Sequence, residues 1–90
     1  MVEADADTLR RMFVQLDIWG RIQDGSQTTV LLSPSPSTAF KDGTSRILLH
    51  FDKGGKHVAS THRIMNEKTG QVLHWDEKGI QVGDVWLERF

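Results

Sequence analysis

Residues 46–76, RILLHFDKGGKHVASTHRIMNEKTGQVLHWD, decide the fold. Apolar and polar residues alternate along three segments of this stretch, and side chains of a strand point alternately to its two faces. The pair Gly54-Gly55 predicts a tight turn after the first segment, and residues 67–70 (EKTG) predict a longer turn after the second. The stretch therefore predicts an antiparallel meander of three strands.

The two turns fix which residues lie opposite one another in the predicted meander. The expected pairs are Asp52 with His57, Phe51 with Val58, Leu49 with Ser60, Met65 with Val72, Ile64 with Leu73, His62 with Trp75 and Arg63 with His74. This register predicts a core face made of Ile47, Leu49, Phe51, Val58, Ser60, His62, Ile64, Leu73 and Trp75. It predicts a polar face made of Leu48, His50, Asp52, His57, Ala59, Thr61, Arg63, Met65, Val72, His74 and Asp76.

Before the meander, the chain begins with a helical pattern. Residues 7–16 carry apolar side chains at helical spacing, namely Leu9, Met12, Phe13 and Leu16. Asp5 or Asp7 can cap this helix, and residues 1–5 are expected to fray. The helix is apolar on one side, so it must pack on the core face of the sheet.

Other strands are predicted on both sides of the meander. Asp24-Gly25 indicates a hairpin between residues 18–23 and 27–33. Residues 33–44 contain Pro34 and Pro36 and predict a long Ser/Pro-containing loop. After Asp76, residues 77–79 predict a turn and 80–82 a return strand, while 85–90 predict a final strand with a free edge for strand addition.

These patterns predict a single α+β domain over residues 1–90, with an N-terminal helix packed on one face of a curved antiparallel β-meander of five or six strands. Acidic and basic residues nearly cancel to a net charge of −1, which makes duplex DNA an improbable ligand. The chain has no cysteine, so thiolate chemistry is excluded. No apolar stretch approaches the roughly 20 residues of a membrane span. A cytoplasmic protein without membrane contact is expected.

The predicted polar face carries the first candidate site. His50, His57, Arg63 and His74 project from three neighbouring strands to one side in the predicted register. Histidine is the usual acid or base near neutral pH, and arginine stabilises developing negative charge. These residues are the catalytic candidates of a small metal-independent ribonuclease. The alternative is that they form the solvated side of a sheet that buries only its other face.

The pattern His-x-Asp occurs at His50/Asp52 and again at His74/Asp76, which makes a metal site a second candidate. Residues two apart on a strand lie on the same face, and two imidazoles with two carboxylates suit a divalent ion. However, the predicted middle strand separates the two pairs by about 10 Å. No metal and no cofactor is therefore expected.

Residues 43–58, GTSRILLHFDKGGKHV, resemble the strand-turn-strand segment of some small toxins of toxin–antitoxin systems. The segments LHFDKGG (49–55) and LHWDEKG (73–79) resemble the hairpin repeats of large bacterial polymorphic toxins, with His in place of Tyr. The acidic and histidine pattern expected downstream in the first family does not occur here. Neither resemblance assigns a role to any residue.

The function expected from the sequence is that of a small non-enzymatic protein-interaction module, such as an inhibitor, an immunity-type protein or a phage-encoded regulator. It would bind another protein, or a second copy of itself, through a sheet face or an edge strand. The ribonuclease-like toxin is the first alternative. An RNA-binding module, in which Arg63, Lys53 and Lys56 contact the phosphates, is the second.

Overall fold

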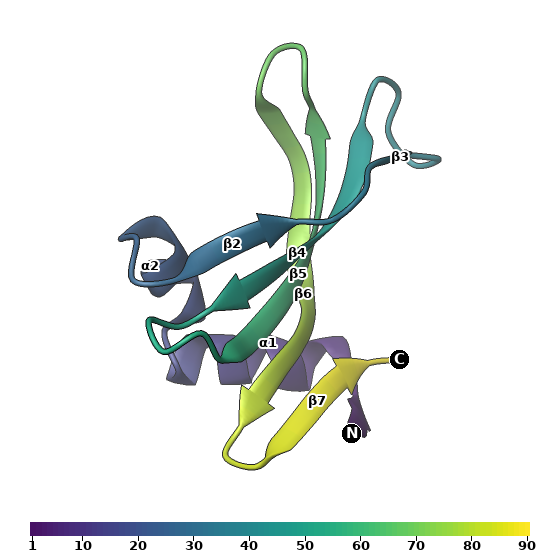
Figure 1. Ribbon diagram of the computed structural model, residues 1–90. Coiled ribbons are helices and arrows are strands. Elements are labelled where there is room, and N and C mark those ends of the chain that lie inside the picture. The colour runs from purple at the N-terminus through teal and green to yellow at the C-terminus, as the bar shows by residue number, and fades with distance from the viewer.

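The computed structural model describes all 90 residues as two helices and one mixed, mostly antiparallel sheet (Figure 1). The helices are α1 (Ala6–Gln15) and α2 (Ile18–Gln23). The strands are β1 (Val2–Ala4), β2 (Thr28–Leu31), β3 (Ser35–Pro36), β4 (Thr44–Phe51), β5 (His57–Asn66), β6 (Gln71–Val82) and β7 (Val85–Arg89). The predicted α+β class is confirmed, with seven strands where five or six were expected.

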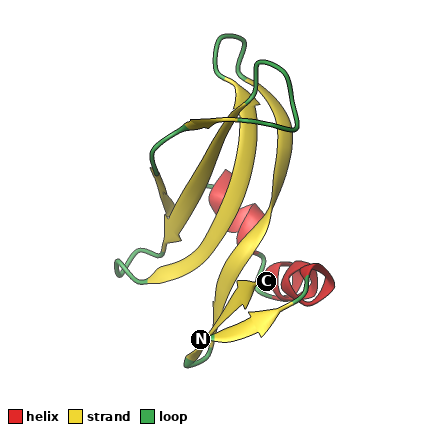
Figure 2. Ribbon diagram, turned by 90° about the vertical axis from the view of Figure 1, so that its right-hand side faces the viewer, coloured by secondary structure: helices red, strands yellow, loops and turns green.

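The sheet is open and has the strand order β1-β7-β6-β5-β4-β2, with β3 also paired to β4. Only the β1–β7 pair is parallel. Residues 1–5 were expected to fray, yet Val2–Ala4 form β1, because β7 offers them an unpaired edge. The long strands curve strongly in the side view (Figure 2). The strand β6 pairs with β5 over residues 71–80 and with β7 over residues 79–82, so it joins β7 to the rest of the sheet. Neither helix is long and apolar enough to cross a membrane.

The helix α1 forms as predicted. Asp5 is its N-cap, and its carboxylate accepts a hydrogen bond of 2.7 Å from the Thr8 amide, a contact that stabilises helix starts. Leu9 and Phe13, one turn apart, are fully buried. Asp17 adopts a left-handed conformation with φ of 51° and separates α1 from the next helix.

Residues 18–23 were expected to form a hairpin strand, and this prediction is wrong. They form α2, in which Ile18 is buried while Trp19 and Ile22 pack against the core from the same side. The Trp19 ring lies 5.6 Å from the Phe13 ring and 5.2 Å from the Trp75 ring, measured between centroids. The packing of Ile18, Trp19 and Ile22 against the core therefore outweighs the turn signal of Asp24-Gly25, and Asp24 is instead the C-cap of α2.

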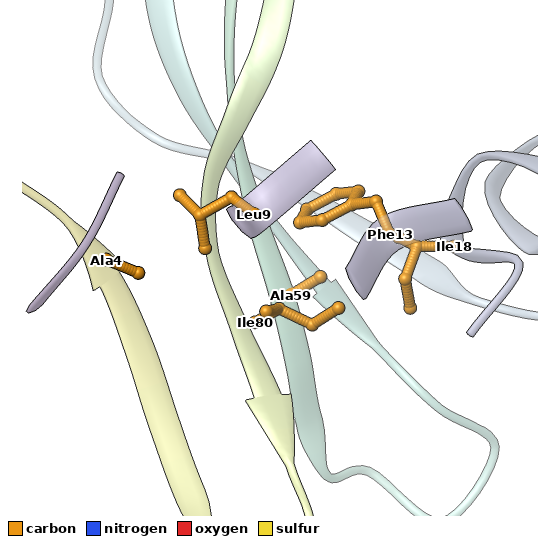
Figure 3. Packing of buried hydrophobic residues seen from close by; sticks show 6 residues of the cluster. All are labelled: Ala4, Leu9, Phe13, Ile18, Ala59 and Ile80. Carbon is orange, nitrogen blue, oxygen red and sulfur yellow. The ribbon is translucent and has the colours of Figure 1, made fainter. Parts of the chain in front are cut away.

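The main core lies between the helices and the middle of the sheet (Figure 3). It consists of small and aliphatic side chains around one aromatic ring, namely Ala4, Leu9, Phe13, Ile18, Ala59 and Ile80. Four of these six residues come from β1 and the helices, and the other two come from β5 and β6. The helices therefore cover the face of the sheet that carries Ala59 and Ile80.

Three β-bulges change the predicted register. The strands β4 and β5 pair Leu49 with Ser60 as predicted, but Phe51 pairs with His57, leaving Val58 as an extra residue. Met65 pairs with Val72 as predicted, after which Leu73 is skipped and Ile64 pairs with His74. Lys78 is skipped in the same way, so β6 continues through residues 77–79, where a turn was expected.

The assignment of core and polar faces was wrong. The side that the helices cover, called here the helix face, includes Leu48, His50, Ala59, Thr61, Arg63, Trp75, Glu77 and Ile80. The opposite side, called here the open face, includes Ile47, Leu49, Phe51, His57, Ser60, His62, Ile64, His74, Asp76 and Trp86. Most of the predicted core residues therefore lie on the open face, where Ile47, Leu49 and Phe51 remain partly exposed.

The helix face can be buried because its polar groups bond to one another. His50 Nδ1 lies 2.9 Å from Thr29 Oγ1, and His50 Nε2 lies 2.8 Å from Thr61 Oγ1. The indole N–H of Trp75 donates to the same Thr61 oxygen over 2.8 Å. A buried polar group that is hydrogen-bonded avoids most of the desolvation penalty. Hydrophobic alternation alone could not identify this polar network as part of the interior.

Candidate functional site

The four predicted catalytic residues do not converge. His50 is completely buried on the helix face, and Arg63 lies on the same face with its guanidinium carbon 5.8 Å from the centre of the Trp75 ring. His57 and His74 belong to the open face, where they have different neighbours. His57 packs between Phe51 and a ring from β7, whereas His74 stacks on Phe40. The predicted shared polar face is therefore not formed.

His50 is unsuited to catalysis for a second reason. Burial, with a smaller contribution from the charge of nearby His57, lowers the pKa of His50 to about 4. The ring is neutral at physiological pH, and both its nitrogens are occupied by threonine hydroxyls. His50 therefore has a structural role in the interior.

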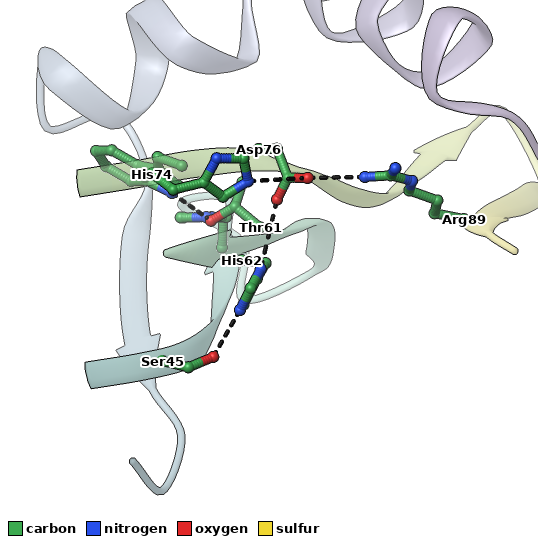
Figure 4. Close-up of polar contacts among 8 residues, drawn as sticks. Ser45, Thr61, His62, His74, Asp76 and Arg89 are labelled. Carbon is green, nitrogen blue, oxygen red and sulfur yellow. Dashed lines mark hydrogen bonds and ion pairs between the residues drawn. The ribbon is translucent and has the colours of Figure 1, made fainter. Parts of the chain in front are cut away.

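A different polar cluster forms on the open face, and it joins four strands (Figure 4). His62 lies in the middle of β5, with Asp76 of β6 directly opposite. The Nδ1 atom of His62 is 3.6 Å from Oδ1 of Asp76, and Nε2 of His74 is 3.3 Å from Oδ2 of the same carboxylate. Arg89, at the end of β7, donates to Asp76 Oδ2 over 2.7 Å.

The bulge at Leu73 creates this cluster. In the predicted register, His62 belonged to the core face while His74 and Asp76 belonged to the polar face. One extra residue in β6 moves His74 and Asp76 to the side of His62. The second His-x-Asp pattern, His74/Asp76, was the sequence signal for this cluster. The group that joins it is His62 of the middle strand, and not the first pattern, His50/Asp52.

The cluster is half-open to solvent and combines one carboxylate, one guanidinium and two imidazoles. The side chains of His62, His74, Asp76 and Arg89 are 29%, 43%, 24% and 39% exposed, respectively. The Asp76 Oδ1 atom is enclosed and has no hydrogen-bond partner. Ser45 Oγ lies 2.6 Å from Nε2 of His62, which leaves the Nδ1 atom of that ring directed at Asp76. These groups can move protons or hold a cation.

The open face also presents partly exposed aromatic and aliphatic side chains. Phe51, His57 and Trp86 form a row with ring centroids 5.2 Å and 4.6 Å apart. Beside this row, β2 forms one edge of the sheet, and Val30, Leu31 and Leu32 are 44%, 49% and 40% exposed. Three consecutive exposed aliphatic residues at a sheet edge are uncommon in a protein that has no partner there.

Comparison with protein-family models, with curated proteins and with solved structures gives no match. The function must therefore be inferred from these surfaces.

Proposed function

We propose that the protein is an interaction module that binds an extended segment of another protein by strand addition at β2. The observation that carries this proposal is the free edge of β2, which pairs with β4 on one side and with nothing on the other. All four of its residues are exposed. An edge strand offers unpaired N–H and C=O groups, to which a partner strand can add.

The hydrogen-bond pattern identifies the free groups. The Leu32 amide donates to the Ile47 carbonyl over 3.0 Å, which continues the β2–β4 ladder. Alternate residues of an antiparallel strand bond to the same neighbour, so Val30 also faces β4. Thr29 and Leu31 therefore direct their N–H and C=O groups away from the sheet. The exposed side chains of Val30 and Leu31 add an apolar contact on each face.

The opposite edge of the sheet is less suitable. The final strand was expected to have a free edge, but β1 covers β7 with three parallel pairs. The strand β1 that replaces it as the edge is only three residues long. Among the two edges, β2 offers the longer ladder and the larger apolar surface.

The two alternatives receive less support. The ribonuclease candidates lie on two faces, as described above. For RNA binding, the row of Phe51, His57 and Trp86 provides rings on which bases could stack. However, the indole N–H of Trp86 donates to Glu88 over 2.8 Å, which places a carboxylate at the end of that row. A net charge of −1 gives phosphate little additional attraction. The inhibitor, immunity-type and regulator roles stay predictions.

Replacing Leu31 by proline tests the proposal. The substitution removes one outward N–H and keeps the Val30 and Leu32 bonds to β4, since proline is tolerated at the free side of an edge strand. Peptides selected from a random library on the wild-type protein should bind Leu31→Pro at least tenfold more weakly. They should bind Leu31→Val, which keeps the N–H, with near wild-type affinity in fluorescence polarisation.

Hydrogen exchange locates the binding site independently. The amides of Thr29 and Leu31 should become protected when a selected peptide binds. Sedimentation of the protein alone will show whether a second copy supplies the strand, because the Leu31→Pro variant would then be monomeric. Equal affinity of the selected peptides for wild type and Leu31→Pro would refute strand addition at β2.

A further inference from the structure

We propose that His62, His74 and Asp76 form a binding site for one divalent transition-metal ion, for which Zn²⁺ is the best match. One nitrogen of each imidazole and one carboxylate oxygen all lie within 4.8 Å of one another. Two imidazoles and one carboxylate are a common donor set for zinc, and imidazole disfavours Mg²⁺ and Ca²⁺. This inference is independent of strand addition at β2.

Each imidazole lies close to the donor spacing of a tetrahedral ion from one oxygen of the carboxylate, and the full set of donors is wider, within 4.8 Å. Zinc bonds to nitrogen and oxygen are about 2.0–2.1 Å long, so the donors of a tetrahedral site lie about 3.3 Å apart. The separation of His62 Nδ1 from Asp76 Oδ1 is 3.6 Å, and that of His74 Nε2 from Asp76 Oδ2 is 3.3 Å. Binding one ion would bring the three donors together from 4.8 Å to about 3.3 Å, a change that rotation of the side chains can supply.

The surrounding contacts already hold the ligands in place. Ser45 engages Nε2 of His62, so the ring presents Nδ1 to the cluster, as outer contacts of metal-bound histidines usually do. The Phe40 ring stacks on His74 at 6.3 Å with an interplanar angle of 23°. Arg89 holds Oδ2 of Asp76, while the enclosed Oδ1 atom has no donor of its own. A metal ion would provide the missing partner of Oδ1.

Arg89 also opposes the ion, because its positive charge lies 2.7 Å from the carboxylate that must attract a second cation. Without Arg89, the negative charge of Asp76 would no longer be neutralised by a neighbouring guanidinium. Removing Arg89 should therefore strengthen metal binding. A cluster held together only by the Arg89–Asp76 ion pair would show no such gain.

Three protein ligands leave the fourth position of a tetrahedral zinc site open, as in catalytic zinc sites. The exposure of His74, at 43%, lets water or a small anion reach that position. The site is thus able to hold an exchangeable fourth ligand.

The test uses the full-length protein without a histidine tag, freed of metal by chelation. Calorimetric titration with Zn²⁺ should give one site per chain, and Co²⁺ should give the intense visible bands of a tetrahedral complex. His62→Gln, His74→Gln and Asp76→Asn should each weaken Zn²⁺ binding at least tenfold. Arg89→Gln should tighten it severalfold. His57→Gln is the matched control, since it removes an open-face histidine outside the trio and should bind like wild type.

A second measurement identifies the donor atoms. Imidazole ¹⁵N spectra recorded with Zn²⁺ should show a metal shift at Nδ1 of His62 and at Nε2 of His74, with His50 and His57 unchanged. Circular dichroism of each variant verifies that it is folded. Absence of a stoichiometric site in the folded wild type, or equal affinity of wild type and His74→Gln, overturns the proposal.

Discussion

At the scale of single residues, His50 shows how polar side chains can form an interior. Its two nitrogens are bonded to Thr29 and Thr61, and Thr61 in turn accepts the indole N–H of Trp75. Read along the sequence, His50 is a polar residue in an alternating strand, which favours exposure. The outcome differs because partners for both nitrogens lie on neighbouring strands, which a linear pattern does not show.

This burial predicts a dependence of stability on pH. The unfolded chain protonates His50 near pH 6.5, whereas the folded protein does so only near its lowered pKa of about 4. Between these values the unfolded state binds the extra proton. The free energy of unfolding contributed by His50 is therefore intact above pH 6.5 and falls by roughly 3 kcal/mol as the pH drops to about 4.

Urea unfolding at pH 7, 5.5 and 4 measures this effect, with His50→Gln as the comparison. Glutamine does not titrate, so the variant should have a lower free energy of unfolding than wild type at pH 7 but should lose less of it on acidification. Carboxylates titrate in both proteins, and the difference between the two curves isolates His50. Parallel curves for the two proteins would contradict the assignment.

At the scale of elements, Gly79 allows the antiparallel contact between β6 and β7. A β-carbon at Gly79 would lie 2.5 Å from the Trp86 ring and 2.6 Å from Oε1 of Glu88, both closer than van der Waals contact. Gly79→Ala should therefore displace Trp86 and destabilise the protein by about 1–3 kcal/mol. For a domain of this size, each kcal/mol lowers Tm by about 4–8 °C.

Gly54→Ala is the matched control for this prediction. A β-carbon there would meet only Asp52 Oδ1, at 3.4 Å, so the substitution should change Tm by a few degrees at most. Thermal unfolding followed by circular dichroism compares the two variants. A similar Tm for both variants would show that the Trp86 ring accommodates a β-carbon at residue 79 without loss of stability.

The elements also show how far the sequence could predict this fold. The helix at 6–15 and the turns before His57 and Gln71 follow from spacing, caps and glycines, and all are present. The bulges at Val58, Leu73 and Lys78 have no such local signal, because an extra residue in a strand keeps its β-propensity. Each bulge reverses the faces beyond it. Single bulges therefore separated the predicted histidines and brought His62, His74 and Asp76 together.

At the scale of the whole molecule, the two ends of the chain lie side by side (Figure 1). Their contact is β1 on β7, and the Phe90 amide continues it by donating to the Ala4 carbonyl over 3.4 Å. Ala4 also belongs to the core, against the side chains of α1. The strand β1 therefore covers the edge of β7, adds Ala4 to the core and leads directly into the N-cap of α1.

Removing residues 1–4 should expose the β7 edge and lower the free energy of unfolding by roughly 2–4 kcal/mol, at about 1 kcal/mol for each lost hydrogen bond with some lost burial. Asp5 remains, so α1 keeps its N-cap. Amide exchange in Val85–Arg89 should quicken more than exchange in β4 and β5, because β7 alone loses a neighbour. Val2→Thr, which keeps the backbone of β1 and changes an exposed side chain, is the control.

Unchanged protection of β7 in the shortened chain would mean that β1 does not hold this edge in solution. In that case the protein would have two free edges for strand addition, and Leu31→Pro would abolish binding at only one of them.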